Sequence, residues 1–371
     1  MKVKLDKVCK RIYAGGDVPK DRYSTVMTSE YTVPIYANAE KDDGLYGYTD
    51  TARENELSIT VAARGTIGFT AIRREPFLPV VRLITVVPDL SKVSERYLYY
   101  ALKNCKPASS GTSIPQLTVP DIKKNEIELY SLPVQEKIAD KLDVVVRIIA
   151  LRQQELQRLD DLVKARFVEL FGNLVSGDKI KTNKHKIGDI AFVTKLAGFE
   201  FTKYVQYKDY GDIIMLRGLN CKKGKLILDD IKWIDKTTSD LLPRSKLYYG
   251  DILMTYAGTI GDVAMVDADN KYHLAPNVAK ITLKEKLYNP VFLMHLFLYT
   301  NDYIMSFASK VAQASINMEK IRNFEYFFPD ADMQNQFAAF VEQTNKSKEA
   351  IQKALDEAQL LFDSLMQKYF G

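Results

Sequence analysis

The sequence Gly-Thr-Ile-Gly occurs twice in this chain, each time between two apolar runs. Residues 62–72 read AARGTIGFTAI, and residues 256–266 read YAGTIGDVAMV. The two copies stand 193 residues apart in a chain of 371. Self-similarity over such a distance indicates that one structural unit is built twice.

The remaining similarities follow the same order along the chain. After the first anchor the spacing changes from 193 to 199 residues, which implies a six-residue insertion in the second copy. The matching segments are KLDKVC (4–9) with KIGDIA (186–191), QLTVPDIKK (116–124) with SINMEKIRN (315–323), Gln135 with Gln334, and ELFG (169–172) with KYFG (368–371). We therefore expect an internal duplication with pseudo-two-fold symmetry.

Each copy begins with a pattern typical of strands and turns. In the first, residues 57–72 predict two strands joined at the glycines, and VVRLITVVP (80–88) predicts a buried strand. Residues 250–266 and 277–283 have the same character in the second copy. Helices are expected to follow at 94–104 and at 289–309. The fold class is therefore α+β, with two similar sheet-containing domains.

Each copy ends in a long stretch without Gly or Pro, residues 135–171 and 334–370. Both stretches show a heptad seam that is apolar at most positions. The first seam comprises Ile138, Leu142, Val145, Ile149, Arg152, Leu156, Leu159, Val163, Arg166 and Leu170. The second comprises Phe337, Val341, Thr344, Lys348, Ile351, Leu355, Ala358, Phe362, Leu365 and Tyr369. The polar residues stand at different positions in the two seams. This difference favours a single register of pairing between the two helices.

The two long helices could be arranged in either of two ways. Each helix could pack only on its own domain, but about 37 residues make a rod near 55 Å, much longer than such a domain needs. Pairing of the two helices is favoured, and the duplication makes them antiparallel. The expected divisions are a first domain at 1–133, a first helix at 134–172, a basic linker at 173–186, a second domain at 187–331 and a second helix at 332–371.

Composition excludes several classes of function. The three cysteines and three histidines are scattered, so no metal site is expected, and the net charge of +5 is compatible with nucleic acid. No Gly-x-x-x-x-Gly-Lys-Ser/Thr loop or Asn-Pro-Pro-Tyr motif is present. Asp356-Glu357-Ala358-Gln359 lies in the second heptad helix and is interpreted as its solvated face. We expect a non-catalytic, cytoplasmic protein, since neither a signal peptide nor an apolar run of membrane length is present.

The order of these parts resembles the specificity subunit of type I restriction-modification systems. GDILMTYAGTIGDVAMV (250–266) is similar to the family's recurring form, and residues 38–72 are similar to its first domain. YSLPVQEKIADKL (130–142) and YFFPDADMQNQFAAFV (326–341) resemble the starts of its helices. The second of these lacks the Pro-Leu register of the first, so partner contacts are expected to differ between the halves.

The resemblance implies that each domain is a target recognition domain that reads one half of a bipartite, asymmetric DNA target. The helices would set the half-site separation and dock methyltransferase subunits, two in number. The implied partners also include motor-nuclease restriction subunits. This chain would hold no cofactor of its own, and S-adenosylmethionine, ATP and Mg would belong to the partner subunits, which methylate adenine at N6.

Candidate DNA contacts lie near the repeated turns, where Arg suits guanine and Gln or Asn suits adenine. They are Arg64, Thr66, Arg73, Arg74 and Gln116 in the first domain and Tyr256, Thr259, Gln313 and Asn317 in the second. Each could equally be a surface residue, and the turns could serve only the architecture. The alternative function is a two-headed protein–protein scaffold on a coiled-coil rod without DNA specificity.

Overall fold

A computed structural model describes residues 1–105, 116–181, 183–309 and 314–371 of the chain. It contains two compact units. The first consists of residues 1–154 together with 352–371, and the second of residues 155–351. Each unit therefore contains part of both long helices.

The first unit is built on a four-stranded antiparallel sheet with the strand order β2-β8-β5-β6. These strands are β2 (Cys9–Ala14), β5 (Ser58–Val61), β6 (Thr70–Arg73) and β8 (Ile84–Pro88). A second sheet has the order β4-β3-β7, from β3 (Val33–Tyr36), β4 (Leu45–Thr49) and β7 (Leu78–Pro79), with β3 and β7 parallel. β1 (Lys2–Lys4) pairs with β9 (Glu126–Glu128).

The second unit repeats this topology strand for strand. Its main sheet has the order β11-β19-β16-β17, from β11 (Ala191–Lys195), β16 (Ile252–Thr255), β17 (Val263–Met265) and β19 (Val278–Leu283). Its smaller sheet has the order β15-β12-β18, from β12 (Ile213–Leu216), β15 (Lys232–Ile234) and β18 (Tyr272–Leu274). β10 (Lys184–Lys186) pairs with β20 (Glu325–Phe327). The predicted duplication and α+β class are confirmed.

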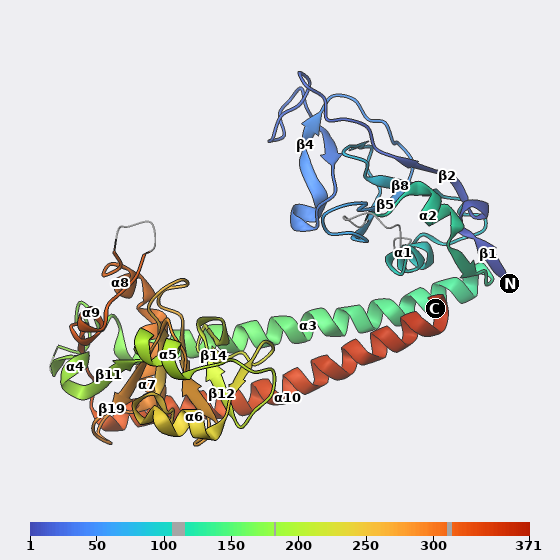
Figure 1. Cartoon of the computed structure of the whole chain (residues 1–371). Coiled ribbons are helices and arrows are strands. Elements are labelled where there is room, and N and C mark those ends of the chain that lie inside the picture. Colours follow the sequence, from blue (N-terminus) through green and yellow to red (C-terminus); the bar gives the residue numbers. More distant parts are fainter. Residues whose placement is uncertain (106–115, 182, 310–313) are drawn as a thin grey trace. The chain divides into compact units, whose positions relative to one another are not determined.

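Helices pack on the main sheets at matching places. α1 (Glu95–Lys103) packs on β5 and β6, and α7 (Pro290–Tyr299) packs on β17 (Figure 1). Short helices follow at α2 (Val119–Lys124) and α9 (Met318–Arg322). The second unit has further elements: α4 (Ile187–Ile190), α5 (Gly198–Tyr204), β13 (Cys221–Lys222), β14 (Lys225–Leu226), α6 (Lys236–Leu241) and α8 (Asn301–Met305).

Two expectations about the second unit need correction. The single helix expected at 289–309 is broken at Thr300, which has non-helical φ and ψ and donates its hydroxyl proton to Leu296 O at 2.6 Å. The expected linker, 173–186, ends in a strand because residues 184–186 pair with residues 325–327. That pairing matches β1 with β9, so the strands of the second unit begin at β10.

The two long helices are α3 (Leu132–Phe171) and α10 (Ala331–Phe370), green and red in Figure 1. The first half of α3 and the end of α10 share the core of the first unit, where Leu142 and Met366 are buried. The end of α3 and the start of α10 share the core of the second, where the rings of Phe171 and Phe337 lie 5.6 Å apart. The pairing within each unit is therefore antiparallel, as predicted.

The predicted seams lie on the covered faces of both helices, since every seam residue is buried or half-buried. Asp356 and Glu357 are exposed while Ala358 is buried. This is the pattern expected of a solvated helix face, because the seam is the only part of that turn withdrawn from water.

A buried glutamine fixes the start of each long helix. Gln135 accepts from Ser94 N at 2.8 Å and donates to Lys92 O and Tyr130 O, both at 2.9 Å. Gln334 likewise accepts from Asn289 N at 2.9 Å and donates to Pro329 O at 2.8 Å. Because Ser94 and Asn289 are the N-caps of α1 and α7, each glutamine ties a sheet-packed helix to a long helix.

The polar seam residue Lys348 forms an ion pair with Asp160 of α3, with 2.5 Å between Nζ and Oδ1. The Lys348 side chain is 15% exposed and that of Asp160 is 46% exposed. Asp160→Ala should destabilise the second unit by about 1–2 kcal/mol, because it leaves a largely buried ammonium group unpaired.

Lys348→Met should cost less than Asp160→Ala, since the half-exposed carboxylate regains water while the methionine fits the seam. Urea unfolding of both variants measures the difference. A larger loss in Lys348→Met than in Asp160→Ala would contradict this account of the pair.

Candidate nucleic-acid interface

Each Gly-Thr-Ile-Gly sequence forms the turn between two strands of a main sheet, β5–β6 in the first unit and β16–β17 in the second. Both glycines of each turn have positive φ, between 66° and 86°, which side chains other than hydrogen rarely allow. The turns close through the same bonds, Gly68 N to Ala62 O and Gly261 N to Thr255 O, both at 2.9 Å. The repeated glycines are thus required by backbone geometry.

Between the two glycines of each turn, the isoleucine side chain packs inward and the threonine side chain is exposed. Ile67 and Ile260 are partly buried against the cores of their units. Thr66 and Thr259 are exposed at the tips. The architectural role is therefore established for Gly and Ile, and the two threonines are free to meet a ligand.

In the first unit, polar side chains connect the loops beside this turn. Arg64 is exposed, and its Nε donates to Gln116 Oε1 at 2.9 Å. Asn38 accepts from Ala63 N at 2.7 Å and donates to Val81 O. These bonds hold the turn, the start of α2 and the β7–β8 connection in one loop cluster.

The second unit keeps the backbone of this cluster but changes its side chains. Leu117 N donates to Ala63 O at 3.0 Å in the first unit, and Ile316 N donates to Tyr256 O at 2.9 Å in the second. Ala257 and Ser315, which form a β-bridge, therefore occupy the places of Arg64 and Gln116. Tyr256 is half-buried, with Lys195 Nζ 5.5 Å from its ring centroid.

The second unit carries its basic side chains on the hairpin β13–β14, residues 221–226, which we call the lysine hairpin. Lys222, Lys223 and Lys225 are all exposed. Gly224 N donates to Val263 O at 2.8 Å, and Lys223 N donates to Asp262 Oδ1 at 3.4 Å, so the hairpin is fixed beside the repeated turn. Three ammonium groups on a short hairpin suit an anionic ligand such as a phosphate backbone.

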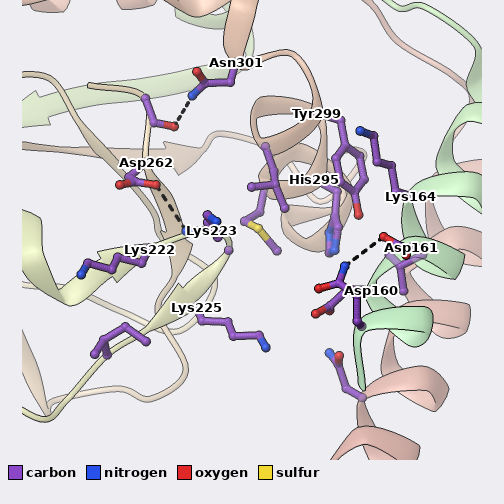
Figure 2. A pocket seen from close by; sticks show the side chains of 18 of the residues that line it. Asp160, Asp161, Lys164, Lys222, Lys223, Lys225, Asp262, His295, Tyr299 and Asn301 are labelled. Carbon is purple, nitrogen blue, oxygen red and sulfur yellow. Dashed lines mark hydrogen bonds between the residues drawn. The ribbon is translucent and has the colours of Figure 1, made fainter. Parts of the chain in front are cut away.

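A cavity of about 850 Å³ lies between the lysine hairpin, the 259–262 turn, α7 and the long helices of the second unit. Figure 2 shows Lys222, Lys223 and Lys225 across this cavity from Asp160, Asp161 and Lys164 of α3. Asn301 supports the turn by donating to Gly261 O at 2.9 Å. Burial lowers the pKa of His295 to about 4, so its ring is neutral at physiological pH. The charged groups at this cavity are therefore its lysines and aspartates.

Two arginines predicted to contact DNA are engaged within the first unit. Arg73 is 2% exposed, donates to Asp43 Oδ2 and Asp43 O, both at 2.6 Å, and lies 3.6 Å from the centroid of the Tyr36 ring. Its prediction as a DNA contact needs correction, because a buried guanidinium held by these bonds cannot reach a base edge. Arg74 is exposed but forms a bidentate ion pair with Glu95, at 2.8 and 2.5 Å.

The remaining candidate DNA contacts are Asn317 and Gln313. Asn317 is the N-cap of α9 and accepts from Lys320 N at 2.8 Å, as Thr118 caps α2 in the first unit. Gln313 lies outside the described residues. The analysis of the sequence did not single out the lysine hairpin, although CKKGK (221–225) was its visible signal. In the described part of the chain, no three His, Cys, Asp or Glu side chains gather as metal ligands.

The fold and the loop clusters define a duplicated α+β protein whose repeated scaffold presents two different polar surfaces. A family model, the type I restriction modification DNA specificity domain, matches residues 1–161 and 180–359. The chain belongs to this family. The predicted family is thus confirmed.

Several relatives are similar over parts of the chain. A type I specificity subunit of Mycoplasma pneumoniae is 37% identical over 147 residues, 40% of each chain, and a second is 38% identical over 140 residues. The matched region thus spans about two fifths of these relatives. The EcoBI specificity subunit of Escherichia coli is 22% identical over 343 residues, 83% of this chain and 71% of that one.

Solved structures share the fold over the whole chain. The S subunit of a type I system from M. genitalium has a TM-score of 0.56 at 14% identity, covering 100% of this chain and 96% of that one. A chain from a study of complex assembly in a type I system has a TM-score of 0.60 at 12% identity, covering 100% and 97%. None of the helices in the described residues is long and apolar enough to cross a membrane.

Proposed function

We propose that each unit of this chain reads one half of a bipartite, asymmetric target in double-stranded DNA. The observation that carries the proposal is the difference between equivalent positions on one scaffold. Arg64 and Gln116 in the first unit correspond to Ala257 and Ser315 in the second. Because base edges are distinguished by the side chains offered to them, two such units would read different sequences.

In this proposal the chain is not catalytic and works in the cytoplasm with two methyltransferase subunits, which supply S-adenosylmethionine-dependent methylation of adenine N6. Motor-nuclease subunits with ATP and Mg complete the restriction enzyme. Thr66 and Thr259, exposed on their turns, would contact phosphate or base. The protein–protein scaffold is less favoured, because it gives no reason for the difference between Arg64–Gln116 and Ala257–Ser315.

Methylation sequencing of cells with and without the gene tests the proposal. We expect one motif, made of two different half-sequences separated by a fixed number of unread base pairs, to lose methylation when the gene is removed. An unchanged methylation pattern in a strain whose methyltransferase subunit remains active would overturn it.

The lysine hairpin should contribute to DNA affinity through phosphate contacts. Replacing Lys222, Lys223 and Lys225 with Ala should weaken binding by the isolated chain and reduce the slope of log affinity against log salt by about 1 per lysine that touches phosphate. Gel-shift titrations over a range of salt concentrations measure both quantities.

The matched control replaces three exposed helix lysines, Lys137, Lys141 and Lys353, and removes the same charge. If both triple variants bind equally, the hairpin has no special role and only net charge matters.

An apolar stripe on α3 is proposed to dock a methyltransferase subunit. Val144, Ile148 and Leu151 lie at positions i, i+4 and i+7 of the helix and are 57%, 40% and 47% exposed. Side chains at this spacing share one helix face. Replacing all three with Gln should abolish co-purification with the methyltransferase subunit while the melting temperature changes little, since none is in a core. Retained assembly would show that the partner binds elsewhere.

A further inference from the structure

Arg64 and Gln116 form a side-chain pair at the exposed end of the first unit's main sheet. Arg64 stands at the end of the β5 side of the repeated turn, and Gln116 precedes α2. The backbone next to the pair is fixed, because Leu117 N donates to Ala63 O at 3.0 Å. The hydrogen bond from Arg64 Nε to Gln116 Oε1, at 2.9 Å, then orients the guanidinium group of Arg64.

This bond decides which hydrogen-bonding groups remain available. It uses the Nε–H of Arg64 and an acceptor position on Gln116 Oε1. The two terminal amino groups of Arg64 and the amide NH₂ of Gln116 are left as donors, and one lone pair of Gln116 Oε1 is left as an acceptor. The terminal amino groups of Arg64, which is exposed, therefore form an edge that carries donors alone.

A donor edge discriminates between bases in the major groove. Guanine offers two acceptors there, O6 and N7, whereas adenine offers N7 beside the N6 amino donor. A free glutamine suits adenine because it has both an acceptor and a donor, but Gln116 has its oxygen directed to Arg64. The two terminal amino groups of Arg64 are complementary to guanine O6 and N7.

We propose that Arg64 contacts guanine O6 and N7 in the first half-site and that Gln116 is the positioning residue that fixes its orientation. This assignment rests on the proposed function of the first unit as a DNA reader. Arg64 differs in this respect from Arg73 and Arg74, which are bound to Asp43 and Glu95. Within the described residues, the structure gives Arg64 no carboxylate partner.

The second unit cannot make this contact at the equivalent place. Ala257 has no hydrogen-bonding side chain, and Ser315 has only a hydroxyl that rotates freely in place of a planar fork. The guanine contact is therefore confined to one half of the target. The second half supplies an internal control in every measurement.

The test uses the chain assembled with its methyltransferase subunits and a DNA library in which each position of both half-sites is varied. Arg64→Ala and Arg64→Lys should each lose discrimination at one guanine of the first half-site by about 10-fold or more, the range of a bidentate contact. Discrimination in the second half-site should not change, which also shows that the variants are folded.

Gln116 is tested by a matched pair of variants. Gln116→Glu keeps an acceptor for Arg64 Nε, so the preference for guanine should persist. The overall affinity for DNA should fall, because the new carboxylate is negatively charged and lies near the phosphates. Gln116→Met fills similar space without an acceptor, so the preference should weaken at the same guanine and no other position. A purely structural role would lower activity on all sequences equally.

Two results would overturn the assignment. If the wild-type complex is specific but the Arg64 variants keep every base preference, Arg64 is not the guanine reader and the proposed function stands. If the wild-type complex methylates without sequence preference, the proposed function fails and the assignment fails with it.

Discussion

Exchanging residues 155–351 for the matching unit of another family member is expected to replace one half of the recognised sequence and leave the other half unchanged. The core of the second unit is contained within these bounds, from Val163 on α3 to Val341 on α10. The hybrid therefore keeps each core whole. Methylation mapping of the hybrid complex is the measurement, and a change in both half-sequences would show that the units do not read independently.

The bounds of this exchange matter for its outcome. The domain limits expected from the sequence, 187–331, would separate Phe292 from Phe167 and Phe171, whose rings lie 5.9 and 5.0 Å from it. A hybrid made at those limits combines two unrelated sets of aromatic side chains in one core. It should melt at a lower temperature than the 155–351 hybrid, because mismatched cores typically cost about 1–3 kcal/mol or more.

Inserting one heptad into each long helix is expected to lengthen the unread spacer of the target by about three base pairs. Seven residues add about 10 Å of helix, and each base pair occupies about 3.4 Å. The insertions belong after Leu156 and after Ile351, because the ion pair between Asp160 and Lys348 places residues 157 and 351 of the second unit opposite each other.

The half-sequences themselves should survive this change, since no residue of either loop cluster is altered. Activity should fall, because three extra base pairs also rotate one half-site by about 100° around the duplex. Insertion of five residues at the same places is the control, because it rotates the apolar seam by about 140° and should destabilise the pair. Methylation of the original target with unchanged spacing would show that the helices do not set the distance.

Regular features of the fold could be predicted from the sequence because they repeat. The Gly-Thr-Ile-Gly turns, the heptad seams and the paired glutamines each occur twice, so one copy checks the other. Irregular features could not. The break of the second helix at Thr300 and the lysine hairpin have no counterpart among the described residues of the first unit. Phe167 and Phe171 lie off the seam because they enter the core of the second unit.

The candidate site was less predictable for a physical reason. An exposed arginine that contacts a base and a buried structural arginine look the same in a sequence. They differ in the side chains with which they form hydrogen bonds and ion pairs in the fold. Arg73 is bound by Asp43, thirty residues earlier, and Arg74 by Glu95. Arg64 was distinguished from both only when its contact with Gln116, fifty-two residues later, was known.

The discontinuous core of the first unit has a consequence for the order of synthesis. That core includes Met366 of α10. The ring of Phe370 lies 4.9 Å from the ring of Tyr97, and Phe370 O accepts a hydrogen bond from Asn104 Nδ2 at 2.7 Å. The buried hydrophobic cluster of the second unit reaches only to Val341 on α10, and that unit ends at Ile351. Domains usually complete folding in the order in which the ribosome makes them. Here the half that is translated first must wait for the last turns of α10, so it is the half that finishes last.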